Sequence, residues 1–148
     1  MSLYITGKKN FSLSKELENK LNKAFLLICK EEEISNRSVN LKILTNTDIQ
    51  KLNKKYRKIN NPTNVLSFTN EDISKSITGD LGDIAISYEY LQKESYQQNK
   101  KFDDHFIHML IHAVYHILGF DHKNDEMAKL MESKEIKILK KLNINNPY

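Results

Sequence analysis

Three histidines near one end of the sequence are spaced for metal binding. His112 and His116 are four residues apart, and His122 follows Gly119 within the segment HAVYHILGFDH. Residues four apart on a helix project from the same face, so both imidazoles can reach a single tetrahedral ion. Gly119 stands where a left-handed residue would end the helix and turn the chain back, which brings His122 round as a third ligand.

Three protein ligands define the chemistry that such a site would perform. They leave the fourth position of a tetrahedral zinc ion open to water, and this open position distinguishes catalytic zinc from structural zinc. We therefore predict one zinc ion, held by His112, His116 and His122, which activates water for hydrolysis. Imidazole also suits nickel, copper and iron, so other divalent transition metals are alternative occupants.

The remaining two histidines lie on the same predicted helix. All five histidines of the chain fall between positions 105 and 122. His108 precedes His112 by four residues, but ligands at 108, 112 and 116 would spread over more than about 10 Å of helix axis. We therefore interpret His108 as a core residue or as a partner of the ligands. His105, at the start of the helix, is expected to be exposed.

The residue after the first histidine, Ala113, argues against a peptidase. Metzincin proteases share the histidine spacing but carry a glutamate at this position as the general base. A metal still lowers the pKa of its water toward about 7, but without the carboxylate the metzincin route loses its proton carrier. A metalloprotease-like hydrolase is therefore retained only as an alternative.

The elements that must position these histidines follow from the hydrophobic periodicity. Apolar residues at helical spacing predict helices over 13–30, 45–58, 87–100, 103–118 and 125–142. Short apolar runs predict strands over 39–44, 65–68 and 81–87, with an exposed loop at EDISKSITG. This order predicts an α/β fold, a single domain over 1–148 whose small mixed sheet of about four strands is covered by about five helices. The polar tail NINNPY is expected to be frayed or loosely docked.

The composition is that of a soluble globular protein. Of the 148 residues, 39% are hydrophobic and 28% are charged. No apolar run approaches the about 18 residues of a membrane span, and the first residues lack the pattern of an export signal. The only cysteine, Cys29, excludes an intrachain disulfide. A cytoplasmic location with no membrane partner is therefore expected.

The charge balance bears on the partner. A total of 23 Lys and Arg against 19 Asp and Glu gives a net charge of +4. This excess mildly favours an anionic partner such as nucleic acid. Scattered lysines on a solvated surface explain the same excess equally well.

The segment HAVYHILGFDH, with TNVLSF and LGDIAIS upstream in the same order, resembles the YbeY family over most of the chain. The resemblance implies an α/β fold with a helix-borne three-histidine zinc site. It also implies a cytoplasmic, single-strand-specific endoribonuclease that acts in ribosomal RNA maturation and ribosome quality control. The implied partners are ribosomal RNA and the ribosome or its associated proteins, and no DNA partner is expected.

The family's functional arginine corresponds to Arg57 in LNKKYRKINNPTNVLSF. A guanidinium can bind a phosphate through two N–H groups and neutralise charge on a phosphodiester under attack. The competing interpretation is a solvent-exposed basic residue. The chain departs from the family at Ala113, where glycine is usual, and at Asn64, where aspartate is common. Neither departure removes a ligand.

Three further acidic or hydroxyl residues accompany these motifs. Asp121, beside the third histidine, either orients an imidazole or caps the following helix together with Asp125. Ser67 and Asp83 match family segments but are assigned no role.

The non-enzymatic alternative for this protein is a ribosome-associated factor whose basic surface binds RNA and whose metal is structural.

Overall fold

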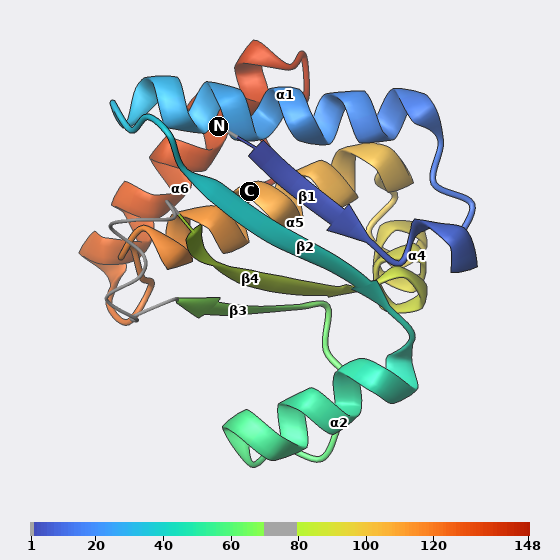
Figure 1. Cartoon of the computed structure of the whole chain (residues 1–148). Coiled ribbons are helices and arrows are strands. Elements are labelled where there is room, and N and C mark those ends of the chain that lie inside the picture. The colour runs from blue at the N-terminus through green and yellow to red at the C-terminus, as the bar shows by residue number, and fades with distance from the viewer. Residues whose placement is uncertain (1, 70–79) are drawn as a thin grey trace.

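The computed structural model describes residues 2–69 and 80–148. Its sheet has the order β1-β2-β4-β3 (Figure 1). β1 and β2 are parallel, as are β2 and β4, whereas β3 is antiparallel to β4. The strands are β1 (Ser2–Thr6), β2 (Ser38–Leu44), β3 (Val65–Thr69) and β4 (Asp80–Ser87). The sheet is therefore mixed, as predicted.

Five α-helices occur among the described residues, with a short 3-10 helix η1 (Lys8–Asn10) after β1. They are α1 (Lys15–Glu31), α2 (Asn46–Arg57), α4 (Tyr88–Gln97), α5 (Phe102–Ile117) and α6 (Asp125–Lys141). The predicted α/β fold is thus confirmed, with element bounds shifted by a few residues. The expected loop at EDISKSITG lies outside the described residues. None of the described helices has the length and apolar content that a membrane span requires.

The first strand, β1, is the element that the periodicity did not predict. Its sequence SLYIT is short, and only Leu3 is classed as buried. The strand forms by parallel pairing with β2, where Ile5 lies opposite Leu41. This pairing joins residues far apart in the sequence, so no local pattern indicates it.

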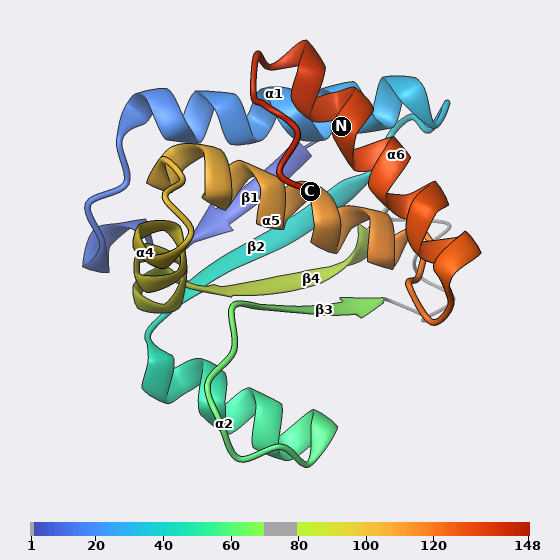
Figure 2. The ribbon, with the colours of Figure 1, turned by 180° about the vertical axis from the view of Figure 1, so that it is seen from behind.

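Helix α5 is the centre of the fold. It lies behind the sheet in Figure 1 and in front of it in Figure 2, and it packs against α1, α4, α6, β3 and β4. Its fully buried side chains include Phe106, Ile107, Leu110, Ile111 and Val114. A helix that is apolar around most of its circumference must be buried. This burial fixes α5 relative to the elements around it.

Helix α2 packs differently, through one smaller cluster. Ile49 is fully buried against Leu44, Leu66 and Ala85, and Leu52 is only partly buried there. The side chain of Thr45 caps the helix by accepting a hydrogen bond from the Asp48 amide at 3.2 Å. The last turn of α2 is exposed, and Arg57 is its final residue.

Candidate metal centre

Helix α5 positions two of the clustered histidines, and a glycine turn positions the third. Gly119 has φ +101°, and its N–H donates to the His116 carbonyl at 3.0 Å. A Cβ at Gly119 would meet no heavy atom within 4 Å, so the backbone conformation rather than the available space requires glycine. The predicted helix stop is confirmed, and His122 returns to the cleft that His112 and His116 line.

The three imidazoles are close enough to share one ion. Nε2 of His112 lies 3.1 Å from Nε2 of His116, and one ligand atom from each of His112, His116 and His122 lies within 4.8 Å of the others. Ligands of a tetrahedral ion with bonds of about 2.0–2.1 Å are about 3.3 Å apart. The cluster therefore fits a metal ion, without distinguishing which one.

The protonation of His116 also suits a ligand. Burial lowers the pKa of this imidazole, and repulsion from His112 and His122 lowers it further. The uncharged imidazole is the form that offers a lone pair to a metal. Because three charged imidazoles would repel one another at this distance, the clustering favours the uncharged imidazole, which is the form that binds a metal.

A buried carboxylate, Glu135 of α6, lies behind the cluster. Its Oε2 is 3.2 Å from Nδ1 of His112, and its Oε1 is 2.8 Å from both Nε2 of His108 and the hydroxyl of Tyr148. Burial alone would raise the pKa of Glu135. The hydrogen bonds from His108, His112 and Tyr148, with the charge of His112, outweigh burial and lower that pKa to about 2.

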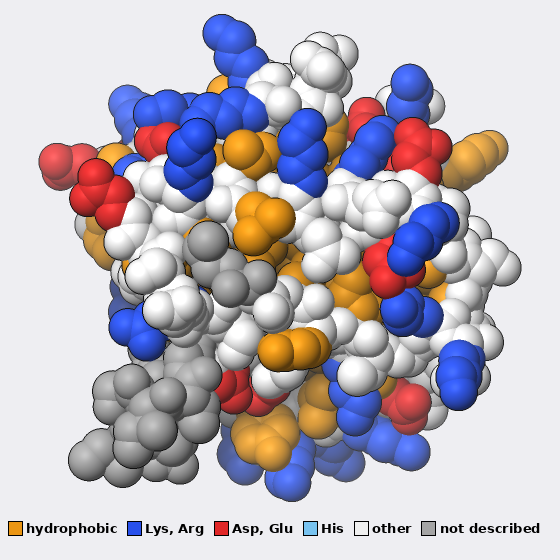
Figure 3. Space-filling model, turned by 45° about the horizontal axis from the view of Figure 1, so that its top comes forward, with side chains coloured by type: hydrophobic (Ala, Val, Ile, Leu, Met, Phe, Trp, Pro, Cys, Tyr) orange, Lys and Arg blue, Asp and Glu red, His pale blue; other side chains and the backbone are white. Residues whose placement is uncertain are grey.

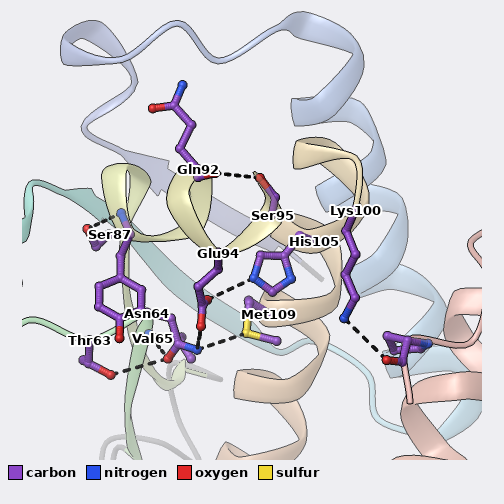
Figure 4. A network of polar contacts seen from close by, with 12 residues as sticks. Thr63, Asn64, Val65, Ser87, Gln92, Glu94, Ser95, Lys100, His105 and Met109 are labelled. Atoms are coloured by element: carbon purple, nitrogen blue, oxygen red, sulfur yellow. Dashed lines mark hydrogen bonds and ion pairs between the residues drawn. The ribbon is translucent and has the colours of Figure 1, made fainter. Parts of the chain in front are cut away.

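The two other histidines have different outcomes. His108 is buried, as the interpretation as a core residue requires, and its Nε2 contacts Glu135, which also contacts the predicted ligand His112. The expectation that His105 is exposed is wrong, because its exposed fraction is 3%. Helix α4 covers the start of α5, and Nε2 of His105 lies 3.0 Å from Oε1 of Glu94 (Figure 4).

The histidines line a cleft of about 430 Å³ with a polar wall. Glu94 and Asn64 belong to this wall, and the Asn64 amide lies between Glu94 and Met109 in Figure 4. Asn64 Nδ2 donates to Oε1 of Glu94 at 3.4 Å, and its Oδ1 accepts from the Val65 amide at 2.7 Å. Asparagine thus fits this position with both ends of its side-chain amide in use.

Arg57, the last residue of α2, borders the same cleft. It lines the cleft with the three histidines, although α2 and α5 are separate in the sequence. Among residues 2–69 and 80–148, no ion pair of Arg57 is present, and the residue is exposed. Ser67 also lines the cleft, whereas Asp83 borders another hollow beside Phe68. The structure therefore brings Arg57 and Ser67, but not Asp83, to the cleft that the three histidines line.

Asp121 follows neither of its two interpretations. Its Oδ1 accepts a hydrogen bond from the backbone N–H of His122 at 2.7 Å, and this bond lowers the pKa of the carboxyl. The cap of α6 is Asn124, which accepts from the Met127 amide at 2.8 Å. Asp121 thus holds the backbone of the third histidine instead of an imidazole or the helix end.

Sequence reasoning missed Glu135 and Tyr148. Glu135 lies at helical spacing between Met131 and Ile138, both fully buried. A carboxylate on the apolar face of a helix was therefore the available signal. Tyr148 had no comparable signal, because the tail was expected to be frayed or loosely docked. The tail is docked: the Tyr148 hydroxyl contacts Glu135 at 2.8 Å, and Ile144 packs partly buried against the core.

The fold and the site together define a class: an α/β domain that gathers three histidines and an arginine in one cleft. The family model described as endoribonuclease YbeY matches residues 4–143. The chain belongs to the YbeY family. The solution structure of TM1509 from Thermotoga maritima shares the fold, with a TM-score of 0.62 over 96% of this chain and 92% of that chain at 22% identity.

Similar curated proteins carry the same family description. Endoribonuclease YbeY of Francisella tularensis strain SCHU S4 is 42% identical over a 132-residue alignment that covers 86% of this chain and 79% of that protein. The Francisella philomiragia protein of the same name is also 42% identical over 132 residues, covering 84% of its length. The likeness therefore extends over most of both chains.

Proposed function

We propose that this protein is a metal-dependent endoribonuclease that cleaves single-stranded RNA in the cytoplasm during ribosomal RNA maturation and ribosome quality control. The observation that carries the proposal is the single cleft lined by His112, His116, His122 and Arg57. The endoribonuclease description of the family and of the Francisella relatives supports RNA as the substrate. Zinc is the proposed ion, because three imidazoles with an open position suit it.

The residues around the cleft have complementary tasks on a phosphodiester. A metal held by the three histidines would supply Lewis acidity at the phosphoryl group. Arg57 presents two N–H groups that bind phosphate oxygens in a fixed geometry and neutralise charge that develops during attack. The hydroxyl of Ser67 adds a further donor on the same wall. The chain's own residues thus hold and orient the phosphate.

Helix α2 supplies positive charge for the rest of the RNA. Its exposed cations besides Arg57 are Lys51, Lys54 and Lys55, followed by Lys58 at its C-cap. Lys and Arg side chains are prominent along the lower edge of the view in Figure 3, where α2 lies. Cations that neutralise phosphates give affinity that is independent of sequence and falls with salt. We therefore propose that RNA enters the cleft along α2.

The surroundings of the first histidine weaken the peptidase alternative. Ala113 is buried and offers no proton carrier after the first histidine. Glu135 contacts Nδ1 of His112, whereas Nε2 of the same ring faces His116. Because the two nitrogens are on different sides of the ring, Glu135 supports the ligand from behind and is not placed as a general base in the cleft.

Cleavage of a single-stranded RNA by wild type, Arg57→Ala and Lys30→Ala proteins tests the proposal. Lys30 is an exposed cation of α1 that neither lines the cleft nor belongs to α2, so it is the matched control. Loss of Arg57 should lower kcat/KM by about 100-fold, as loss of a donor to developing charge typically does. Lys30→Ala should stay near wild type, and both variants should keep their zinc.

Three results would contradict parts of the proposal. Wild-type protein that cleaves RNA equally well after complete metal removal would exclude a metal-dependent reaction. Equal activity of Arg57→Ala and wild type would remove the assigned role of the arginine. A duplex of the same sequence, cleaved as fast as the single strand, would overturn the single-strand specificity.

A further inference from the structure

Glu135 is a fully buried carboxylate that joins three elements of the protein. It projects from α6 and contacts His108 and His112 of α5, together with Tyr148 of the segment after α6. Its exposed fraction is 0%. A charged group is retained in such surroundings only when it is paired and hydrogen-bonded. The structure provides this pairing, and one of the partners belongs to the metal cluster.

The contact with His112 determines which nitrogen of that ring carries the proton. An ionised carboxylate only accepts hydrogen bonds, so Oε2 of Glu135 holds the proton of His112 on Nδ1, at 3.2 Å. Nε2 then keeps its lone pair, and this atom lies 3.1 Å from Nε2 of His116. The carboxylate thus selects the tautomer and the ring orientation that a shared metal needs.

The other oxygen of Glu135 is held separately. Oε1 accepts from the Tyr148 hydroxyl and from Nε2 of His108, each at 2.8 Å. The Tyr148 hydroxyl is also 3.2 Å from Nε2 of His108, so the three groups form a closed set. Nδ1 of His108 is buried and has no hydrogen-bond partner among the described residues. His108 therefore donates its single ring N–H, at Nε2, to the carboxylate of Glu135.

We infer that Glu135 is the positioning residue for the metal ligand His112, and that Tyr148 completes this support from the segment that follows α6. The inference rests on the metal site of the proposed function. It explains why a carboxylate occupies an apolar face of α6 between Met131 and Ile138. It also gives the segment after α6 a role, because the hydroxyl of Tyr148 contacts Glu135 while much of the side chain stays exposed.

Zinc affinity tests the inference independently of RNA cleavage. Wild type, Glu135→Gln and Glu126→Gln are titrated with zinc against a chelating dye, and Glu126 is the matched control because it is an exposed glutamate of the same helix. Loss of such a supporting carboxylate typically weakens metal binding about 10–100-fold, and this loss is expected for Glu135→Gln alone. The visible spectrum of the Co²⁺-loaded variant should also change, because the ligand geometry loosens.

Tyr148→Phe provides a second variant that removes one hydroxyl and preserves the ring. It should weaken zinc binding in the same direction but less than Glu135→Gln, with the metal-free fold unchanged by circular dichroism. If Glu135→Gln does not fold, Tyr148→Phe decides, and wild-type affinity in that variant overturns the inference.

The failure of the inference differs from the failure of the proposed function. A folded Glu135→Gln protein that binds zinc as tightly as wild type overturns the positioning role alone. Wild-type protein that binds no zinc would instead remove the metal site on which both conclusions rest.

Discussion

The two walls of the cleft are built in different ways. On the wall formed by α5, His112 and His116 project from a helix that is largely buried, and Glu135 of α6 contacts His112 from outside the cleft. On the opposite wall, Arg57 is exposed at the end of α2, which packs through a smaller cluster around Ile49. Packing fixes the first wall, whereas the second wall presents the long, flexible side chain of Arg57 to solvent.

This difference matches what the two proposed binding partners, a metal ion and an RNA phosphate, require of the protein. A metal centre needs its donor atoms within about 0.5 Å of the productive geometry, which rigid elements and supporting contacts provide. A phosphate contact from a long cationic side chain tolerates more variation, and the RNA must be able to enter and leave. The wall that holds the ion is therefore buried, and the wall that meets the polymer is exposed.

Truncation of one apolar residue in α5 and one in α2 would measure how differently the helices of the two walls are packed. Ile111→Ala on α5 should lower the free energy of unfolding by about 2–5 kcal/mol, because Ile111 is fully buried. Leu52→Ala on α2 should cost about 1 kcal/mol, since the side chain is only partly buried. Urea unfolding gives both values, and equal losses would contradict the difference between the walls.

Gly119→Ala would sharpen the role of the turn that ends α5. The residue has φ +101°, so a side chain there costs about 1–2 kcal/mol even though the space is open. Zinc affinity should fall as well, because His122 follows this turn. Lys123→Ala, an exposed change in the same loop, is the control and should leave both properties near wild type. Unchanged stability in Gly119→Ala would show that the turn does not need its glycine.

Thr45→Ala should have the smallest effect on stability. It should also show whether the wall at α2 can be weakened without any effect on the metal-binding wall. It removes the hydroxyl that caps α2 through the Asp48 amide, at a cost of about 1 kcal/mol. RNA binding should weaken slightly as α2 frays, whereas zinc affinity should not change. Titrations with RNA and with zinc on the same preparation check both expectations. A parallel loss of zinc would mean that the two walls are coupled.

The same contrast explains which parts of the site could be predicted from the sequence. The pair His112 and His116 and the stop at Gly119 depend on helical periodicity and one backbone conformation, which are local properties. The burial of His105 depends on α4, and the strand β1 depends on pairing with β2. These contacts are long-range, so the local pattern gave the wrong exposure for His105 and no strand at β1.

The contacts of Glu135 and Tyr148 show most clearly that a local sequence pattern does not reveal long-range contacts. Glu135 could have been noticed as a carboxylate on an apolar helix face, but only the packing of α6 on α5 shows that it meets His112. The contact of Tyr148 joins three elements and leaves no periodic trace. Likewise, Arg57 was placed by resemblance, and only the folded chain brings it to the cleft of the histidines.

The central claim is that the three-histidine cluster binds a metal ion, and metal analysis of purified protein tests it most directly. Wild type and the double variant His112→Ala/His116→Ala are each exposed to zinc, dialysed and measured for zinc per chain. The account predicts one ion per wild-type chain and none in the folded double variant. One zinc ion per chain in the double variant would contradict the account.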